Sequence, residues 1–318
     1  MKLKDKTLLN QIKGKIYKDY EIKNITTFKV GGKVDYLIIP QDYDDIRLTL
    51  KFGRDNDIPI YLMGNGSNLL IADSGIKGIV IRISKDNFIK KNIKNNLIIA
   101  ESGVPLYELI SISLKNELSG LENLHGIPGA LGGIITMNAG TDGYSISDFL
   151  KEIKVMDSFG KIFTLPKEEL GFSYRKSLIL EKKLIVLEAL LELRKEKKEN
   201  IFSTLKSRII KRKKTQPLTF PTAGSVFKND GENKAGFLIE KAGCKGLRIG
   251  DAEVSTIHAN FILNRGNATF KDIISLMKII REKVYEKFNI ILNPEIIIMG
   301  EIEEEIPFKI LEPWWKKL

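Results

Sequence analysis

The sequence contains very few of the residues that build disulfide frameworks and zinc sites. Its 318 residues include one cysteine, Cys244, and two histidines, His125 and His258. A single thiol excludes an internal disulfide framework and a thiolate metal cluster, and the two histidines do not have the spacing of a zinc pair. We therefore expect no metal site. We interpret Cys244 as a buried, small apolar residue and expect His258 to satisfy a hydrogen bond in the core.

Long apolar segments are missing as well. No run approaches the length of a membrane span, and the polar start of the chain lacks the apolar core of a signal peptide. We expect a cytoplasmic protein without membrane insertion. Hydrophobic residues still make up 43% of the chain, which excludes a disordered or fibrous protein, and the length predicts two or three domains.

Positive charge is concentrated in one segment. The formal net charge is +11, and residues 194–214 hold ten lysines and arginines against two glutamates. Such a segment is typical of a solvated surface, a nucleic-acid site or a site for an anionic small molecule. Ile201, Leu205 and Ile209 recur every four residues, which predicts an amphipathic helix with one buried face. We expect a structural helix that enters a new domain, place the main boundary within 194–216, and expect no nucleic-acid partner.

Strands and helices alternate without a regular βαβ rhythm, which predicts an α+β fold. We expect a helical extension over residues 1–20 and a tail, 304–318, that packs on the rest of the chain. Thr269 and Asp272 are expected to cap a long C-terminal helix. Hydrophobic patterns predict strands over 34–40, 58–63, 77–83, 96–100, 184–193, 259–264 and 296–300, a hairpin over 153–165, and helices over 42–55, 104–118 and 235–242.

Two glycine-dense loops are candidates for a phosphate site. Residues 64–68, Gly-Asn-Gly-Ser-Asn, follow a predicted strand and expose backbone N–H groups that can donate hydrogen bonds to a diphosphate. Taken alone, this loop is explained better by a tight turn, and it is not a nicotinamide fingerprint because the third glycine is missing. Residues 125–133 form the second loop, and together the two loops favour one extended phosphate ligand. No phosphate-binding loop of the Gly-Lys-Ser/Thr type is present.

Three further residues are candidates for chemistry. Ser225 follows Gly224 within residues 221–229 and supplies a hydroxyl that can give or take a proton, although a Gly-Ser turn entering a strand gives the same pattern. Arg175 lies among aromatic and hydroxyl residues, where a guanidinium binds a carboxylate with two hydrogen bonds or forms a surface salt bridge. Glu295 follows a proline at a strand entrance, where it is either exposed or directed into a cleft.

Taken together, these stretches resemble one family, the UDP-N-acetylenolpyruvoylglucosamine reductases of bacterial cell-wall synthesis. The matching pieces occur in the family's order from about residue 20 to 301. They are Thr26–Gly32, Gly64–Leu70, Gly120–Glu122, Gly126–Gly129, Gly132–Gly133, Met137–Gly140, Tyr174–Arg175, Gln216–Leu218, Ala223–Asn229, Ala242–Gly243, Gly246–Gly250, His258–Phe261 and Pro294–Glu295.

The resemblance implies a FAD-binding unit of two α+β subdomains, of the vanillyl-alcohol-oxidase type, followed by an α+β substrate domain. It places the FAD-binding unit at 21–194, with subdomains of about 21–83 and 84–194, and the substrate domain at 195–303. The short connection between Asn229 and Gly236 resembles the family branch that lacks an inserted tyrosine loop.

The resemblance also implies the cytoplasmic reaction and its partners. NADPH reduces bound FAD, and flavin N5 gives hydride to the β-carbon of the enolpyruvyl group of UDP-N-acetylglucosamine enolpyruvate. Arg175 and Glu295 match the pair that polarises the substrate carboxylate, and Ser225 matches the proton donor to the α-carbon. The product is UDP-N-acetylmuramate, a peptidoglycan precursor, and we expect a monomer. Residues expected at FAD are Gly64, Asn65, Gly66, Ser67, Asn68, Gly126, Ile127, Pro128, Gly129, Gly132, Gly133 and Asn138, and those expected at substrate are Tyr174, Lys228 and Asn229.

Two other functions fit parts of the sequence. A flavin oxidoreductase with a different acceptor would be yellow but would not oxidise NADPH in response to the enolpyruvyl sugar. A basic nucleic-acid-binding protein using residues 194–214 would be colourless and would bind DNA or RNA with a steep salt dependence. The visible spectrum of the purified protein, before and after NADPH and substrate, separates the three.

Overall fold

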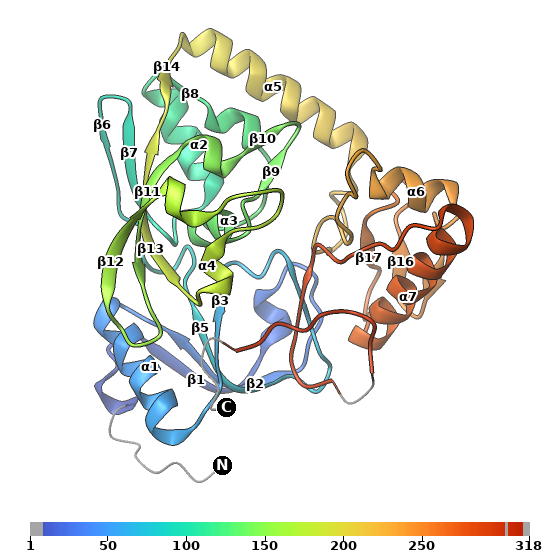
Figure 1. Cartoon of the computed structure of the whole chain (residues 1–318), viewed down its shortest axis with the longest axis horizontal. Coiled ribbons are helices and arrows are strands. Elements are labelled where there is room, and N and C mark those ends of the chain that lie inside the picture. The colour runs from blue at the N-terminus through green and yellow to red at the C-terminus, as the bar shows by residue number, and fades with distance from the viewer. Residues whose placement is uncertain (1–8, 303–304, 314–318) are drawn as a thin grey trace.

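The structure is a computed structural model that describes residues 9–302 and 305–313. Figure 1 shows two sheet-containing lobes on one side, formed by the first two thirds of the chain, and a C-terminal part on the other side. The long helix α5 (Lys198–Thr215) runs along one edge and connects the two sides. Strands and helices are mixed without a repeating βαβ unit, as the sequence predicted.

The first lobe is built on a four-stranded sheet in the order β1-β2-β5-β3. Strands β2, β5 and β3 are parallel to one another, and β1 pairs antiparallel with β2 at the edge. Helix α1 begins after Asp42, whose side chain accepts hydrogen bonds from the backbone N–H groups of Asp44 and Asp45. The elements of this lobe are β1 (Lys15–Glu21), β2 (Lys33–Ile39), α1 (Tyr43–Asn56), β3 (Ile60–Met63), β4 (Leu69–Ile71) and β5 (Ile76–Arg82).

The helical extension predicted over residues 1–20 is wrong over 15–20. Those residues belong to strand β1, and only a 3-10 turn at Leu9–Gln11 precedes it, while residues 1–8 lie outside the described ranges. Six residues of β1 pair with β2, from Lys15 opposite Ile39 to Glu21 opposite Lys33. Pairing with β2 decides the conformation here, and the residues of β1 alone do not indicate that pairing.

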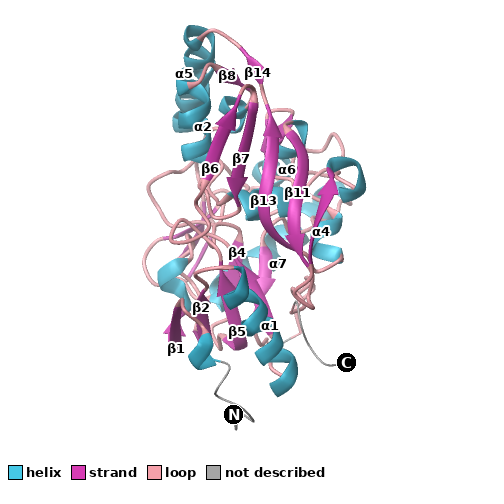
Figure 2. Cartoon of the chain, turned by 90° about the vertical axis from the view of Figure 1, so that its left-hand side faces the viewer, coloured by secondary structure: helices cyan, strands magenta, loops and turns pink. Residues whose placement is uncertain are grey.

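The second lobe contains a five-stranded antiparallel sheet in the order β12-β11-β13-β7-β6, which faces the viewer in Figure 2. The hairpin predicted over 153–165 is confirmed as β11 and β12. The elements are β6 (Lys91–Lys94), β7 (Leu97–Glu101), α2 (Leu106–Lys115), β8 (Leu118–Ser119), α3 (Leu131–Thr136), β9 (Gly140–Thr141), β10 (Tyr144–Ser145), β11 (Leu150–Met156), β12 (Ile162–Pro166), α4 (Leu178–Glu181), β13 (Ile185–Glu192) and β14 (Arg194–Lys195).

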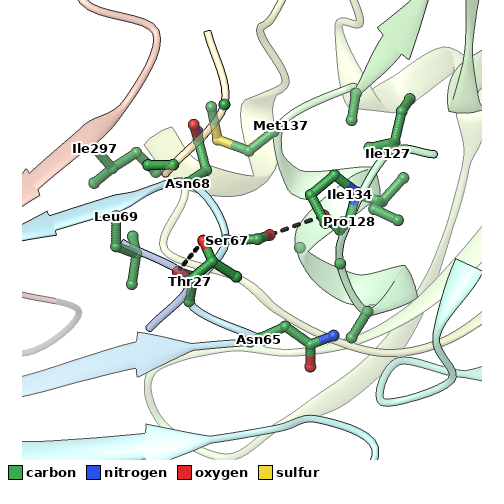
Figure 3. A pocket seen from close by; sticks show the side chains of 18 of the residues that line it. Thr27, Asn65, Ser67, Asn68, Leu69, Ile127, Pro128, Ile134, Met137 and Ile297 are labelled. Carbon is green, nitrogen blue, oxygen red and sulfur yellow. Dashed lines mark hydrogen bonds between the residues drawn. The ribbon is translucent and has the colours of Figure 1, made fainter. Parts of the chain in front are cut away.

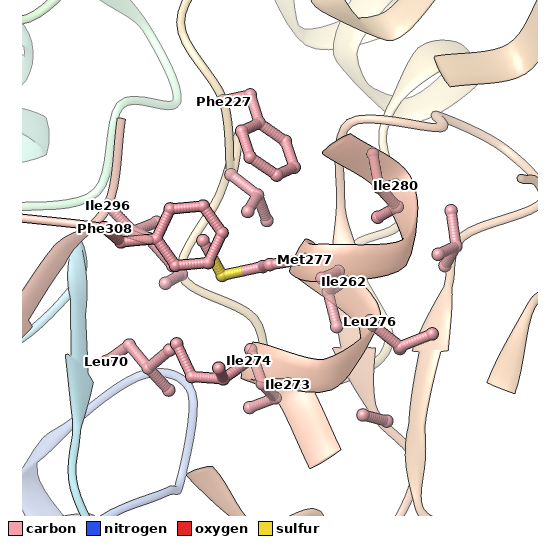
Figure 4. Packing of buried hydrophobic residues seen from close by; sticks show 14 of the residues in the cluster. Leu70, Phe227, Ile262, Ile273, Ile274, Leu276, Met277, Ile280, Ile296 and Phe308 are labelled. Atoms are coloured by element: carbon pink, nitrogen blue, oxygen red, sulfur yellow. The ribbon is translucent and has the colours of Figure 1, made fainter. Parts of the chain in front are cut away.

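The C-terminal part packs helices α6 and α7 with a small antiparallel sheet in the order β15-β16-β17. Thr269 and Asp272 form the predicted capping box of α7. Ile273, Met277 and Ile280 on α7 are almost completely buried, and Figure 4 shows them packed among side chains from several segments. The elements are α6 (Ala235–Lys241), β15 (Arg248–Ile249), β16 (Ala252–Val254), β17 (Ile262–Asn264), α7 (Phe270–Phe288) and β18 (Ile297–Met299).

Strand β18 joins the C-terminal part to the first lobe. It pairs in parallel with β4, with Ile297 opposite Leu69 and Met299 opposite Ile71. The tail then packs on the buried cluster that contains the α7 side chains. Phe308 is buried in that cluster, and its ring centroid lies 6.5 Å from that of Phe227. Both tryptophans of the tail lie outside the described residues. Within the described ranges, no helix has the length and apolarity to cross a membrane, and no cluster of three potential metal ligands occurs.

Candidate active site

A cavity of about 480 Å³ lies where the two lobes meet the C-terminal part. Its walls come from the two glycine-dense loops, from the segment around Ser225 and from the start of β18. Figure 3 shows side chains of both loops around it, including Asn65, Ser67 and Pro128. We call this cavity the first cavity. The segments that line it are 62–69, 127–130, 132–134, 136–137, 139–141, 216–218, 220–225 and residues 295 and 297, among others.

Hydrogen bonds hold the two glycine loops in place across this cavity. The Ser67 hydroxyl donates to the carbonyl of Pro128 at 2.8 Å (Figure 3). The Thr27 hydroxyl donates to the carbonyl of Thr222 at 2.8 Å, which links the first lobe to the segment before Ser225. Gly66 adopts φ = 65°, and a Cβ there would lie 2.7 Å from the carbonyl oxygen of Ile25. Only glycine fits this turn without strain or displacement.

Buried polar atoms without partners gather at the same cavity. Four buried side-chain atoms of the described residues have no hydrogen-bond partner, and three belong to residues that line the first cavity. These three are Asn65 Oδ1, Ser102 Oγ and Gln216 Oε1. Because an unsatisfied buried polar atom costs about 1–3 kcal/mol, their clustering indicates a polar ligand that completes them.

Arg175 and Glu295 form an ion pair beside the first cavity, although 120 residues separate them. The Arg175 Nε atom donates to Glu295 Oε1 at 2.5 Å, and Nη2 donates to the carbonyl of Gly140 at 2.7 Å. Their side chains are only 19% and 15% exposed. Of the alternatives that the sequence left open, a surface salt bridge at Arg175 and an exposed Glu295 are therefore both wrong.

Local backbone geometry positions this pair. Arg175 lies at the tip of a tight turn in which Ser173 and Lys176 exchange backbone hydrogen bonds, and its φ is 53°, in the left-handed region. A non-glycine residue there costs about 1–2 kcal/mol. The guanidinium also lies over the ring of Tyr174, 4.9 Å from its centroid. The turn thus holds Arg175 in a strained conformation that directs its side chain to Glu295 and Gly140.

Ser225 lies next to the same pair. The backbone N–H of Glu295 donates to the carbonyl of Val226 at 2.7 Å, so the residue after Ser225 is bonded directly to the acid. Ser225 lines both the first cavity and the second cavity described below. Among the described residues, its hydroxyl has no hydrogen-bond partner. The preceding Gly224 has φ = 84° and open space where a Cβ would stand. The hydroxyl is therefore available to a ligand.

A second, wider cavity of about 1190 Å³ shares Arg175 and Ser225 with the first. Its walls carry Arg208, Lys211 and Lys214 of α5, and Asp142 at the tip of the β9–β10 hairpin. A hydrogen bond from Lys211, together with the charge of Arg208, lowers the pKa of Asp142. This positive lining suits an anionic ligand.

Two of the three predicted substrate residues meet in the second cavity. The backbone N–H of Asn229 donates to the Tyr174 hydroxyl at 3.4 Å, and both residues line the cavity. Lys228 is not among the residues that line either cavity. The structure therefore gives no support to a direct contact between Lys228 and a ligand.

Most residues predicted to bind the cofactor line the first cavity: residues 64–68, 127–129, 132 and 133. Gly126 and Asn138 do not. The side chain of Arg212 packs against Gly126, at 2.5 Å from the position a Cβ would take. The Asn138 side chain is used within the protein, because its amide donates to the carbonyl of Ser173 and its oxygen accepts from the N–H of Ser147.

The sequence analysis missed Ser102, Arg212 and Gln216 as site residues. Arg212 and Gln216 line both cavities, and Ser102 lines the first. Gln216 belonged to a motif carried by the family resemblance, which was the only signal for it. Arg212 was one of ten cations in a basic segment and could not be singled out.

Both histidines and the cysteine are held in partly or fully buried positions. Burial, and then the charge of Arg212, lower the pKa of His125. Burial also lowers the pKa of His258, whose Nδ1 accepts from the backbone N–H of Asn260. Cys244 is completely buried. The burial of Cys244 confirms its expected place in the core. His258 makes the expected hydrogen bond, but it is half-buried and lines the second cavity.

Comparisons with known proteins match both halves of the chain. The family model "FAD binding domain" matches residues 34–166, and "UDP-N-acetylenolpyruvoylglucosamine reductase, C-terminal domain" matches residues 216–299. The chain is 46% identical over 280 residues to UDP-N-acetylenolpyruvoylglucosamine reductase of Clostridium tetani, covering 88% of this chain and 91% of that protein. It is 42% identical to the protein of the same name from Caldanaerobacter subterraneus, covering 91% and 95%.

A solved structure agrees with these sequence matches. The crystal structure of UDP-N-acetylenolpyruvylglucosamine reductase from Thermus caldophilus superposes with a TM-score of 0.77 at 34% identity. The match covers 90% of this chain and 99% of that one. The fold predicted from the sequence, a FAD-binding unit followed by an α+β C-terminal domain, is thereby confirmed.

The residues around the first cavity fit FAD. Asn65 and Ser102 offer polar atoms without partners, and the loop at 64–68 exposes backbone N–H groups beside a cavity with many apolar walls. A dinucleotide with polar phosphates and a flat, largely apolar ring system requires this combination. From the matches to both halves of the chain, this protein belongs to the UDP-N-acetylenolpyruvoylglucosamine reductase family of FAD-dependent oxidoreductases.

Proposed function

We propose that this protein reduces UDP-N-acetylglucosamine enolpyruvate to UDP-N-acetylmuramate in peptidoglycan precursor synthesis, with NADPH as reductant. In this proposal residues 21–194 hold the cofactor and residues 195–303 form most of the substrate domain. The observation that carries the proposal is the meeting of Arg175, Glu295 and Ser225 at the boundary of the two cavities. These residue types match what reduction of an enolpyruvyl ether requires.

The cofactor supplies the redox step. FAD, when bound, provides the hydride that is added to the β-carbon of the enolpyruvyl double bond. The loops at 64–68 and 127–133 would hold its diphosphate through backbone N–H groups, and Asn65 and Ser102 would complete their hydrogen bonding on it.

The chain's own residues manage the charge and the proton. Addition of hydride to the β-carbon places negative charge on the α-carbon and its carboxylate. The Arg175 guanidinium is fixed by Glu295 and by the Gly140 carbonyl, so it is already oriented when this charge develops. Ser225 then donates a proton to the α-carbon, which completes addition of one hydride and one proton across the double bond. Because a hydroxyl is a weak acid, its positioning beside Val226 and Glu295 matters more than its acidity.

Ser225→Ala tests this assignment. The variant should keep reduction of the flavin by NADPH, because that step requires no proton from Ser225. Reoxidation of the reduced enzyme by the enolpyruvyl sugar should fall by a factor on the order of 10²–10⁴. Rapid-mixing measurements of flavin absorbance separate the two half-reactions. Ser207→Ala on the exposed side of α5 is the matched control, and normal turnover by Ser225→Ala would remove the serine from this role.

A further inference from the structure

Two residues at the end of α5 lie at the junction of the two cavities and have unmet bonding capacity. Arg212 and Gln216 are four residues apart, and the backbone N–H of Gln216 donates to the carbonyl of Arg212. Gln216 is the C-cap residue of α5, directly after the last helical residue, Thr215. Both line the first and the second cavity.

Arg212 is a half-buried cation without a counter-ion. Within the described part of the chain, its side chain forms no hydrogen bond and no ion pair. Burial alone lowers the pKa of its guanidinium. The side chain packs over Gly126, where only the absence of a Cβ leaves room for it. Because a partly desolvated charge without a partner is unfavourable, this position indicates that a ligand group supplies the missing acceptor.

In the part of the chain that the structure describes, the side chain of Gln216 lacks a hydrogen-bond donor, whereas that of Arg212 lacks an acceptor. Its Oε1 atom is buried and has no donor among the described residues. A ligand that satisfies the site must therefore offer an acceptor to Arg212 and a donor to Gln216, side by side. Phosphates and ionised carboxylates offer acceptors only, so they would leave Gln216 Oε1 unsatisfied.

We propose that Arg212 and Gln216 bind the imide edge of a pyrimidine-2,4-dione, with Arg212 donating to a ring carbonyl and Gln216 accepting from the ring N–H. Two ligands of the proposed reaction carry this edge: the isoalloxazine ring of FAD and the uracil of the UDP sugar. The assignment deepens the proposed function and rests on it. Because both residues line both cavities, a ring bound at the junction of the cavities would lie beside the two of them.

Flavin and uracil lead to different consequences at Arg212. A positive charge beside the imide end of the flavin stabilises the reduced cofactor, whose negative charge lies at that end of the ring. Removal of the charge should then lower the midpoint potential, by about 30 mV for each tenfold preferential loss of the reduced form. If uracil is the ligand, the potential of the free holoenzyme should not change.

The experiment uses purified holoenzyme with Arg212→Met, Arg212→Lys and Gln216→Leu. FAD affinity is measured from the fluorescence of flavin released on dilution, UDP affinity from its perturbation of the flavin spectrum, and the midpoint potential by equilibration with redox dyes. Lys213→Met removes a charge from the next position of α5, which is exposed and lines neither cavity, and serves as the control. Thermal unfolding checks that each variant folds.

We expect Arg212→Met to weaken one of the two ligands by about tenfold to hundredfold, because a charged hydrogen bond is lost. Gln216→Leu should weaken the same ligand by about threefold to tenfold. Arg212→Lys keeps the charge and should fall in between. Weaker FAD binding with a lower potential assigns the flavin, and weaker UDP binding at unchanged potential assigns uracil.

Wild-type affinity of all three variants for both ligands would overturn the assignment. A loss for Arg212→Met with none for Gln216→Leu would overturn it as well, because a simple anion site requires only the arginine. These are binding measurements, so their failure leaves the half-reaction test of Ser225 unaffected, and failure of the Ser225 test leaves the FAD measurement valid.

Discussion

The Arg175–Glu295 pair gives the most direct test of how the site handles charge. Arg175 makes two bonds at once, from Nε to Glu295 at 2.5 Å and from Nη2 to Gly140 at 2.7 Å. The single ammonium of a lysine cannot reproduce this fork, although it keeps the charge. Arg175→Lys therefore removes orientation while it leaves the net charge unchanged. Loss of one fixed donor at a developing anion costs on the order of 10²–10³ in rate.

We expect that loss in one half-reaction only. Rapid-mixing measurements should show the reoxidation of Arg175→Lys by the enolpyruvyl sugar slowed by about 10²–10³, with reduction by NADPH unchanged. Arg265→Lys is the matched control. Arg265 also makes two hydrogen bonds over an aromatic ring, both of them to Glu253, at 2.8 and 3.1 Å. Wild-type reoxidation by Arg175→Lys would refute the reasoning. An equal loss in both half-reactions would also refute it, because the arginine would then act on the cofactor or on folding.

Two further predictions concern the fold around the cavities. Gly66→Ala introduces a Cβ 2.7 Å from the Ile25 carbonyl at a φ of 65°, so it should lower the free energy of unfolding by about 1–2 kcal/mol or more, lower the melting temperature and weaken FAD retention. Gly133→Ala is the control, because Gly133 has open space around it and no positive φ, and it should not destabilise the fold. Equal melting temperatures for the two variants would contradict this prediction. Burial lowers the pKa of His258 below its ordinary 6.5. Above pH 6.5 the imidazole is therefore neutral in the folded and in the unfolded chain, whereas below it the unfolded chain binds the proton first and the free energy of unfolding falls. Thermal melts between about pH 7.5 and 5 should show a shallower decline in stability for His258→Gln than for wild type, and parallel curves would exclude a contribution of His258 to the pH dependence.

Local patterns predicted the elements whose stability is local. The α1 and α7 helices follow their caps at Asp42 and Thr269, and the β11–β12 hairpin follows its turn. Strand β1 was mistaken for helix because its partner, β2, begins 12 residues later and the pairing is not recorded in its own residues. The tail after residue 304 was expected to pack on the rest of the chain, and Phe308 does so. The sequence around Phe308 does not indicate that its partner is Phe227.

The site residues also divide into those that the local sequence indicates and those that only the folded chain identifies. The glycine loops and Ser225 could be proposed because their residue types are unusual in themselves. Arg212 and Gln216 could not, since what distinguishes them is a lack of partners in the folded chain. Gly126 shows the reverse error: its loop suggested a ligand contact, but its missing Cβ makes room for Arg212. A glycine can serve a neighbouring side chain as well as a ligand, and only the packing decides between them.

The position of Glu295 explains why the C-terminal part cannot move freely against the first lobe. Glu295 enters β18, which pairs with β4 immediately after the glycine loop at 64–68. The Asn68 side-chain amide donates to the backbone carbonyl of Glu295 at 3.1 Å, so the loop at 64–68 and Glu295 are joined directly. Leu70 of β4 packs in one buried cluster with Ile274 and Met277 of α7 (Figure 4). A sliding or opening motion at this contact would break strand pairing and expose apolar surface together. The geometry between the loop at 64–68 and Glu295 is therefore fixed by the fold. In the proposed reaction, adjustment to substrate is expected from the second lobe and α5, which carry Arg175 and Arg212.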